Sequence, residues 1–334
     1  GACLMSTTTR ETARPAMKTV ATELVTCLLV VGVVLLWMGP SLYRQDLVFL
    51  AATYGLIALG MYLPFVIAGS LSMAYSAYAA IGAYSVAFLS VKQGLSPWLG
   101  WLCGMAISAV VAIVIALATR RLSGFYLAAV TLLFAIAFEH WLGDADQITG
   151  GASGISSIPV PSLFGWTAPR YVQVIAAIVL VCVVAVLIDR LRRSSWGLSL
   201  AIARENPPAV ESSGISPAHL SVIALAVGAA VASMGGALFT ASVQAVTPET
   251  FGLDLVFLAI FMPITGGRGS AWGAPLGALI VVAVTLNMPA YQGSGELLLA
   301  VVVLFILLLA PGGVSGWTRQ AWERLRPTRT REGK

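Results

Sequence analysis

The sequence predicts an all-α membrane protein of about ten transmembrane helices, and composition and charge spacing are the main reasons. Of its 334 residues 58% are hydrophobic and only 10% are charged, with a mean hydropathy of +0.91. Soluble domains are roughly 45–50% apolar and 25% charged. The apolar runs are rich in Ala, Leu, Val and Ile without alternation of polar residues, which favours helices over a barrel in lipid.

Span length sets the number of helices, because a helix needs about 20 apolar residues to cross ~30 Å of hydrocarbon. Residues 47–91 contain no charged residue, which is enough for two crossings with a tight turn near residues 68–71. The same reasoning gives candidate spans at 20–38, 47–67, 71–91, 97–118, 125–142, 171–188, 219–243, 252–265, 270–288 and 296–313. We therefore expect a leader at 1–18, a transmembrane domain at 19–316 with an internal loop at 189–217, and a basic tail at 317–334.

Basic residues predict the orientation of the chain, since cytoplasmic loops are enriched in Lys and Arg. With an even span count, Arg120 and Arg121 after the fourth span and Arg204 after the sixth fall on one side, together with both termini. The long loop 143–170 falls outside. We expect a bacterial cytoplasmic membrane protein whose net charge of +5 reflects topology and lipid contact, with no nucleic-acid partner.

Known catalytic motifs are absent from the sequence. It holds no GxxxxGK[ST], HExxH or GxSxG motif, and its four cysteines are dispersed without a CxxC pair. Glu23, Asp46, Glu139, Asp254 and Glu296 all fall near span ends, whereas carriers driven by ions keep ionisable groups inside the membrane. We expect no enzyme activity, no metal and no cofactor, and an energy supply that comes from another protein.

Two stretches predict broken helices beside a transport path. The eighth span has only 13 residues between Asp254 and Arg268, about 20 Å of helix, and ends in a run of glycines. Residues 63–83 in the first half also combine Pro, Gly-Ser and small residues, and paired interruptions of this kind indicate a transport path. The alternative is that these small residues only pack helices together. The path candidates are Gly69, Ser70, Ser72, Tyr75, Tyr78, Gly266, Gly267, Gly269 and Ser270.

The segment 203–215, ARENPPAVESSGI, is unusually polar for this chain. Pro207 and Pro208 suit the start of a short helix, Glu211 is expected in its first turn, and Gly214 suits its end. A short, rigid, charged helix between spans is suited to the groove of a partner protein. The simpler alternative is a solvated loop.

Several stretches resemble, in order and spacing, the permease subunits of branched-chain amino acid ABC transporters, the LivH/LivM family. They include ITGGASGI (148–155), AIARENPPAVESSGI (201–215), MGGALFTASVQAVTPETFGLDL (234–255), ITGGRGSAWGAPLGALIV (264–281) and LLLAPGGVSG (307–316). The likeness is greater to the LivM type. It implies a channel-forming subunit that pairs with a homologous second permease subunit, two cytoplasmic ABC ATPases that bind the ATP, and an extracytoplasmic solute-binding protein.

The resemblance also implies a role for the polar segment, which would be the coupling helix that contacts the ATPase. The coupling candidates are Arg204, Glu205, Asn206, Glu211 and Gly214. Two other functions stay open from the sequence: a self-sufficient secondary transporter of a small organic solute, and an ABC permease for urea, amides or a sugar.

Overall fold

The computed structural model describes residues 27–286 apart from residues 28, 40, 123, 164, 165, 168 and 268. The predicted leader, the tenth span at 296–313 and the basic tail lie outside the described residues. Of the predicted first span at 20–38, the structure describes residue 27 and the helix Leu29–Met38, and the remaining residues also lie outside the described part.

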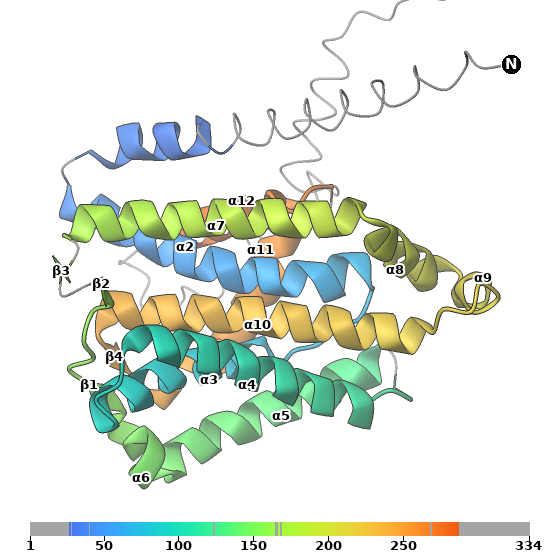
Figure 1. The fold of residues 1–334 in the computed structure, drawn as a ribbon, viewed down its shortest axis with the longest axis horizontal. Helices are drawn as coiled ribbons and strands as arrows, with labels where there is room; N and C mark the ends of the chain where they lie inside the picture. The colour runs from blue at the N-terminus through green and yellow to red at the C-terminus, as the bar shows by residue number, and fades with distance from the viewer. Residues whose placement is uncertain are drawn as a thin grey trace, which may run out of the picture.

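Long apolar helices form one bundle (Figure 1). The main helices are α2 (Leu42–Tyr62) continued by the π-helical turn η1 (Leu63–Ile67), α3 (Tyr75–Ala87) continued by η2 (Phe88–Lys92), α4 (Pro97–Ala118), α5 (Phe125–Asp144), α7 (Arg170–Arg193), α10 (Pro217–Val243), α11 (Leu253–Gly266) and α12 (Gly273–Leu286). Six segments in the described part of the chain are long and apolar enough to cross a membrane. The all-α polytopic membrane class is therefore confirmed, whereas the count of about ten helices stays a prediction.

The predicted spans agree with the helices to within a few residues, with two differences. The third span begins at Tyr75 because residues 68–74 are not helical. The eighth helix, α11, has 14 residues, close to the 13 expected, but a 3₁₀ turn, η4 (Pro248–Phe251), precedes it. Together they form an apolar segment of 19 residues, Pro248–Gly266, which is long enough to cross a membrane, so the short eighth span expected from the sequence is extended.

Helix α10 is the centre of the bundle, with α2, α3 and α4 packed around it. Small residues allow this close approach, as they do at many membrane helix contacts. A Cβ atom at Gly60 would lie 2.4 Å from the carbonyl oxygen of Gly228, and one at Gly236 would lie 1.8 Å from that of Ala79. Any larger side chain at these positions would force the helices apart.

Short elements cover the two ends of the bundle. At one end in Figure 1 lie α6 (Asp146–Thr149), η3 (Gly151–Ser153), β1 (Ile155–Ser156), β2 (Ser162–Leu163), β3 (Trp166–Thr167) and β4 (Ala245–Val246). β1 pairs antiparallel with β4, with Ile155 opposite Val246, and β2 pairs antiparallel with β3, with Ser162 opposite Thr167.

The other end carries α8 (Ser195–Glu205) and α9 (Pro207–Glu211), which project from the bundle (Figure 1). We call it the basic end, because six described arginines lie in or just after the last turns of α4, α7 and α8: Arg120, Arg121, Arg190, Arg192, Arg193 and Arg204. The end with the short strands is called the opposite end.

Candidate functional site

A cavity of about 280 Å³ lies at the basic end, where five parts of the chain meet. Its walls are residues Ala68–Ser70, the last turn of α4, the start of α5, α8 and the first turns of α10. Arg120 and Arg204 line it together with the hydroxyl groups of Ser70, Thr119 and Ser221, and no carboxylate is among its described lining residues. This set of donors suits an anionic group such as a carboxylate.

Arg204 connects α8 to the non-helical segment 68–74. Its guanidinium Nη1 donates a hydrogen bond to the carbonyl oxygen of Val66, at 2.6 Å. The aliphatic part of the side chain lies over Gly69, so that a Cβ at Gly69 would be only 2.9 Å from Cγ of Arg204. Gly69 also has a φ of +70°, a conformation that glycine adopts without strain. Arg204, a predicted coupling residue, is therefore in contact with Gly69, a predicted path residue.

The segment that follows Gly69 leads back into the bundle without helical structure. The Met73 amide donates to the hydroxyl of Thr131 on α5, at 2.8 Å, and α3 begins at Tyr75. The Tyr75 hydroxyl lies beside Gly228, which is 11 residues into α10 and thus about 16 Å along that helix. Non-helical backbone at such depth is stable only where protein or a cavity surrounds it.

The other predicted path residues of the first half are buried around the start of α3. Ser72, Tyr75 and Tyr78 are each about 1% exposed. The rings of Tyr75 and Tyr78 meet edge to face with centroids 5.5 Å apart, and the backbone oxygen of Tyr78 accepts a hydrogen bond from Ser108. The Tyr75 hydroxyl is buried and has no hydrogen-bond partner among the described residues.

The glycines of the second half pack helices instead of lining the cavity. A Cβ at Gly266 would lie 1.7 Å from the carbonyl oxygen of Gly273, and one at Gly277 would lie 1.9 Å from that of Met262. Gly267 ends α11 with a φ of +101°. Gly266 therefore lies in a close helix contact, as the packing interpretation expects, and Gly267 marks the end of α11.

Gly269 and Ser270 lie at the surface of the basic end. The carbonyl oxygen of Gly269 accepts a hydrogen bond from Arg192 on α7, at 2.6 Å, and the Ser270 hydroxyl accepts one from the Trp272 amide. These contacts fix the connection between α11 and α12 to α7. The predicted path residues of the first half therefore lie around the start of α3, whereas Gly269 in the second half contacts α7.

Asp189 is a polar residue that the sequence analysis missed. Its side chain is 1% exposed, and it forms ion pairs with Arg192, at 3.4 Å, and with Arg193. The sequence assigned Asp189 to a loop, but α7 continues to Arg193 and buries it. The signal that could have found it is the i, i+3 and i, i+4 spacing of the two arginines, which places all three side chains on one helix face.

The remaining predicted coupling residues lie on or beside α9 and are exposed. α9 begins at Pro207 and ends at Glu211, and Gly214 follows with a φ of +78°, as the sequence predicts. Glu211 is the last residue of α9, so its expected place in the first turn was wrong, because the helix has only five residues. Glu205 and Asn206 join α8 to α9. The helix α8 itself was not predicted.

The described residues contain no group of three His, Cys, Asp or Glu side chains that could hold a metal ion. A bundle of apolar helices, a non-helical segment that enters it and a charged helical pair at one end are the main features of the described residues.

The chain belongs to the family described as "Branched-chain amino acid transport system / permease component", whose sequence model matches residues 43–311. It is thus a component of a transport system and not a member of an enzyme family.

Named relatives agree with this family. The high-affinity branched-chain amino acid transport system permease protein LivM of Salmonella typhimurium is 29% identical over 82% of this chain and 70% of the relative. The probable branched-chain amino acid transport permease protein LivH of Methanocaldococcus jannaschii is 24% identical over 87% of this chain and 97% of the relative. The fructose import permease protein FruF of Bifidobacterium longum is 26% identical over 78% and 75%. No solved structure matches the chain.

Proposed function

We propose that this permease forms the path by which an ATP-driven importer carries branched-chain amino acids into the cell. The named substrates of the LivM and LivH relatives support this substrate class. Two separate ATPases would bind α8 and α9, a homologous permease would complete the path, and an extracytoplasmic protein would deliver the solute. Residues of the second half, Gly269 and Ser270, would border the path at its cytoplasmic mouth.

The observation that carries the proposal is the contact of Arg204 with Val66 and Gly69. A permease without a nucleotide site responds to an ATPase only through backbone that the ATPase moves. α8 and α9 are the charged helices that project from the basic end, and Arg204 joins α8 to the segment 68–74. Displacement of α8 would therefore displace the entrance to α3, where Ser70, Ser72, Tyr75 and Tyr78 border the proposed path.

The charge distribution supports a cytoplasmic location for the basic end and for both termini. The exposed Ser153 lies at the opposite end and the exposed Ser212 follows α9. A membrane-impermeant thiol reagent added outside should label a Ser153→Cys variant and not a Ser212→Cys variant. The reverse labelling pattern would refute this orientation.

The test of function is uptake of radiolabelled leucine by the complete transporter, with isoleucine, valine, urea and fructose as competitors. ATP-dependent, vanadate-sensitive uptake that only the branched-chain amino acids inhibit is expected. The FruF relative makes a sugar the second candidate, and uptake of radiolabelled fructose without uptake of leucine would establish it. Uptake by the permease alone in liposomes with an ion gradient would instead show a secondary transporter.

The exposed Glu211 tests ATPase binding directly. Loss of one partner of a buried, hydrogen-bonded charge pair costs about 2–5 kcal/mol, so Glu211→Lys should release the ATPases or uncouple their hydrolysis from uptake. Glu249→Lys makes the same charge change at an exposed position of the opposite end and should leave the ATPases bound. Full uptake and normal ATPase co-purification with Glu211→Lys would contradict the coupling role.

A further inference from the structure

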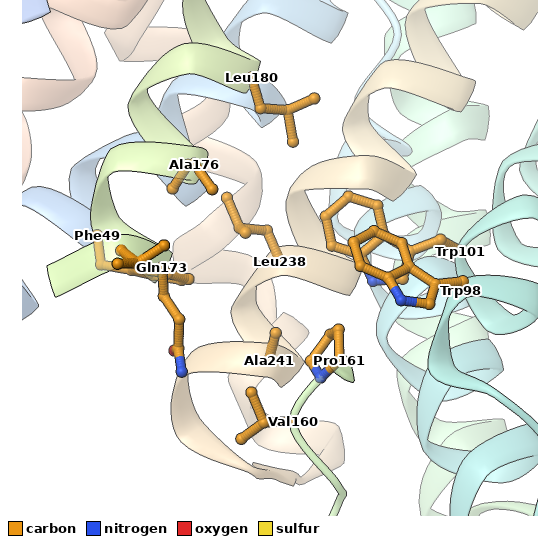
Figure 2. A pocket seen from close by; sticks show the side chains of 12 residues that line it. Phe49, Trp98, Trp101, Val160, Pro161, Gln173, Ala176, Leu180, Leu238 and Ala241 are labelled. Atoms are coloured by element: carbon orange, nitrogen blue, oxygen red, sulfur yellow. The ribbon is translucent and has the colours of Figure 1, made fainter. Parts of the chain in front are cut away.

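An apolar groove of about 280 Å³ lies between α4 and α7 near the opposite end, far from the cavity that Arg204 lines. Figure 2 shows Trp98 and Trp101 on one side of the groove and Gln173, Ala176 and Leu180 of α7 on the other, with Leu238 and Ala241 of α10 between them. The lining is almost wholly apolar, and Gln173 is its polar side chain.

The length of the groove fits one leaflet of a bilayer. Its lining on α7 runs from Val172 to Leu180, which are eight residues apart and so about 12 Å apart along the helix. This length fits within half of a ~30 Å hydrocarbon core. Both α4 and α7 are among the helices that can cross a membrane, and both carry exposed apolar side chains, such as Leu102 and Val183. We therefore expect the groove to face the acyl chains of the bilayer.

Paired opposite charges lie at the outer mouth of the groove. The Arg170 guanidinium donates to Asp46, at 2.7 Å, and to Ser242, at 2.9 Å, and it stacks over Phe49 with its Cζ 4.5 Å from the ring centroid. Phe49 lines the groove, and Ser242 follows a lining residue, Ala241. The Asp46 side chain is 63% exposed, so its carboxylate still faces outward beside the arginine.

We propose that this groove binds a zwitterionic glycerophospholipid of the outer leaflet, of the phosphatidylethanolamine type. One acyl chain fills the space between Trp98, Trp101 and Leu180, and the phosphate contacts Arg170 while the ammonium group contacts Asp46. A purely anionic headgroup fits less well, because the Asp46 carboxylate would repel it. The site is a lipid site at the periphery of the permease, separate from the path for the solute.

The test measures lipids that stay bound to the complete transporter after purification from nanodiscs containing equal amounts of phosphatidylethanolamine and phosphatidylglycerol with identical acyl chains. Mass spectrometry of the intact complex should find phosphatidylethanolamine retained by the wild type. Ala176→Phe fills the groove and should lower the retained amount about tenfold, the effect of roughly two lost buried methylene groups. Val183→Phe makes a similar change on the exposed face of α7 and should retain the lipid.

Asp46→Asn tests the headgroup and changes only an exposed side chain. It leaves Arg170 without its carboxylate partner, so the retained lipid should shift from phosphatidylethanolamine to phosphatidylglycerol. Equal retention by the wild type and Ala176→Phe, or no shift with Asp46→Asn, would overturn the proposal. Cross-linking of an Ala176→Cys variant to residues 287–334 of the same chain, or to a second permease subunit, would also overturn it.

Discussion

The segments 68–74 and 267–272 are built alike but surrounded differently. Each follows a helix at the basic end, and each begins with or near a glycine of positive φ, Gly69 at +70° and Gly267 at +101°. At or near each segment, an arginine donates a hydrogen bond to a backbone carbonyl oxygen. Arg204 donates to that of Val66, and Arg192 donates to that of Gly269.

The two segments differ in how tightly the chain packs around their glycines. Gly69 borders the cavity of about 280 Å³, and the atoms closest to its missing Cβ belong to the flexible Arg204 side chain. At Gly266 and Gly273, by contrast, the backbone of α11 is in direct contact with the backbone of α12. The same residue type thus supplies a loose, adjustable connection in the first half and a fixed corner in the second. Motion during transport is therefore expected in the first segment.

The largest expected effect comes from Gly266→Ala. The new methyl group would lie 1.7 Å from a backbone oxygen, which cannot move as a side chain can. Overpacking costs about 1–3 kcal/mol and occasionally more, and a clash with backbone belongs at the upper end, so the permease should lose thermal stability or fail to accumulate. Gly269→Ala is the matched control, because nothing lies within 4 Å of its Cβ position. Equal melting temperatures of the two variants in detergent would contradict the fixed corner.

Arg204→Ala should impair transport more than folding. It removes a hydrogen bond between a charged group and a carbonyl, worth about 1.5–3 kcal/mol, together with the contact on Gly69. We expect leucine uptake to fall about tenfold or more while permease and ATPases still purify together. Ser199→Ala on the same helix removes only a bond to the local Ser195 carbonyl and should transport normally. Normal uptake by Arg204→Ala would show that the contact of Arg204 with Val66 and Gly69 has no part in transport.

Gly69→Ala should have the smallest effect of the three. The positive φ costs an L-residue about 1–2 kcal/mol, and the methyl group must displace the Arg204 side chain. We expect reduced uptake that is not additive with Arg204→Ala, because residues in contact give interaction energies in a double-mutant cycle. Measured uptake of the two single variants and the double variant checks this. Strict additivity would mean that Gly69 acts through backbone conformation alone.

Most of the helices could be predicted from the sequence, because uncharged runs bounded by arginines mark membrane spans directly. The short helix at Pro207 was also predictable, since proline and glycine fix its two ends locally. The helix α8 was missed because its start depends on one capping contact, from the Gly197 amide to the Ser194 hydroxyl, inside a segment without a strong pattern.

The candidate site was only partly predictable. Glycine-rich stretches in the sequence do not reveal what faces each glycine, so Gly69 beside a cavity and Gly266 against a backbone oxygen look the same. The contact between Arg204 and Val66 spans 138 residues of sequence and arises from the packing of the whole bundle. The burial of Asp189 likewise depends on where α7 ends.

The central claim is that Arg204 transmits ATPase motion to the segment 68–74. The most direct measurement is the thiol-labelling rate of a Ser70→Cys variant in the complete transporter, with and without vanadate-trapped nucleotide, after replacement of Cys3, Cys27, Cys103 and Cys182. The account predicts that the rate differs between the two states, that Arg204→Ala abolishes this difference while Ser199→Ala does not, and that Gly269→Cys shows none. A nucleotide-dependent difference at Ser70→Cys that persists unchanged in Arg204→Ala would contradict it.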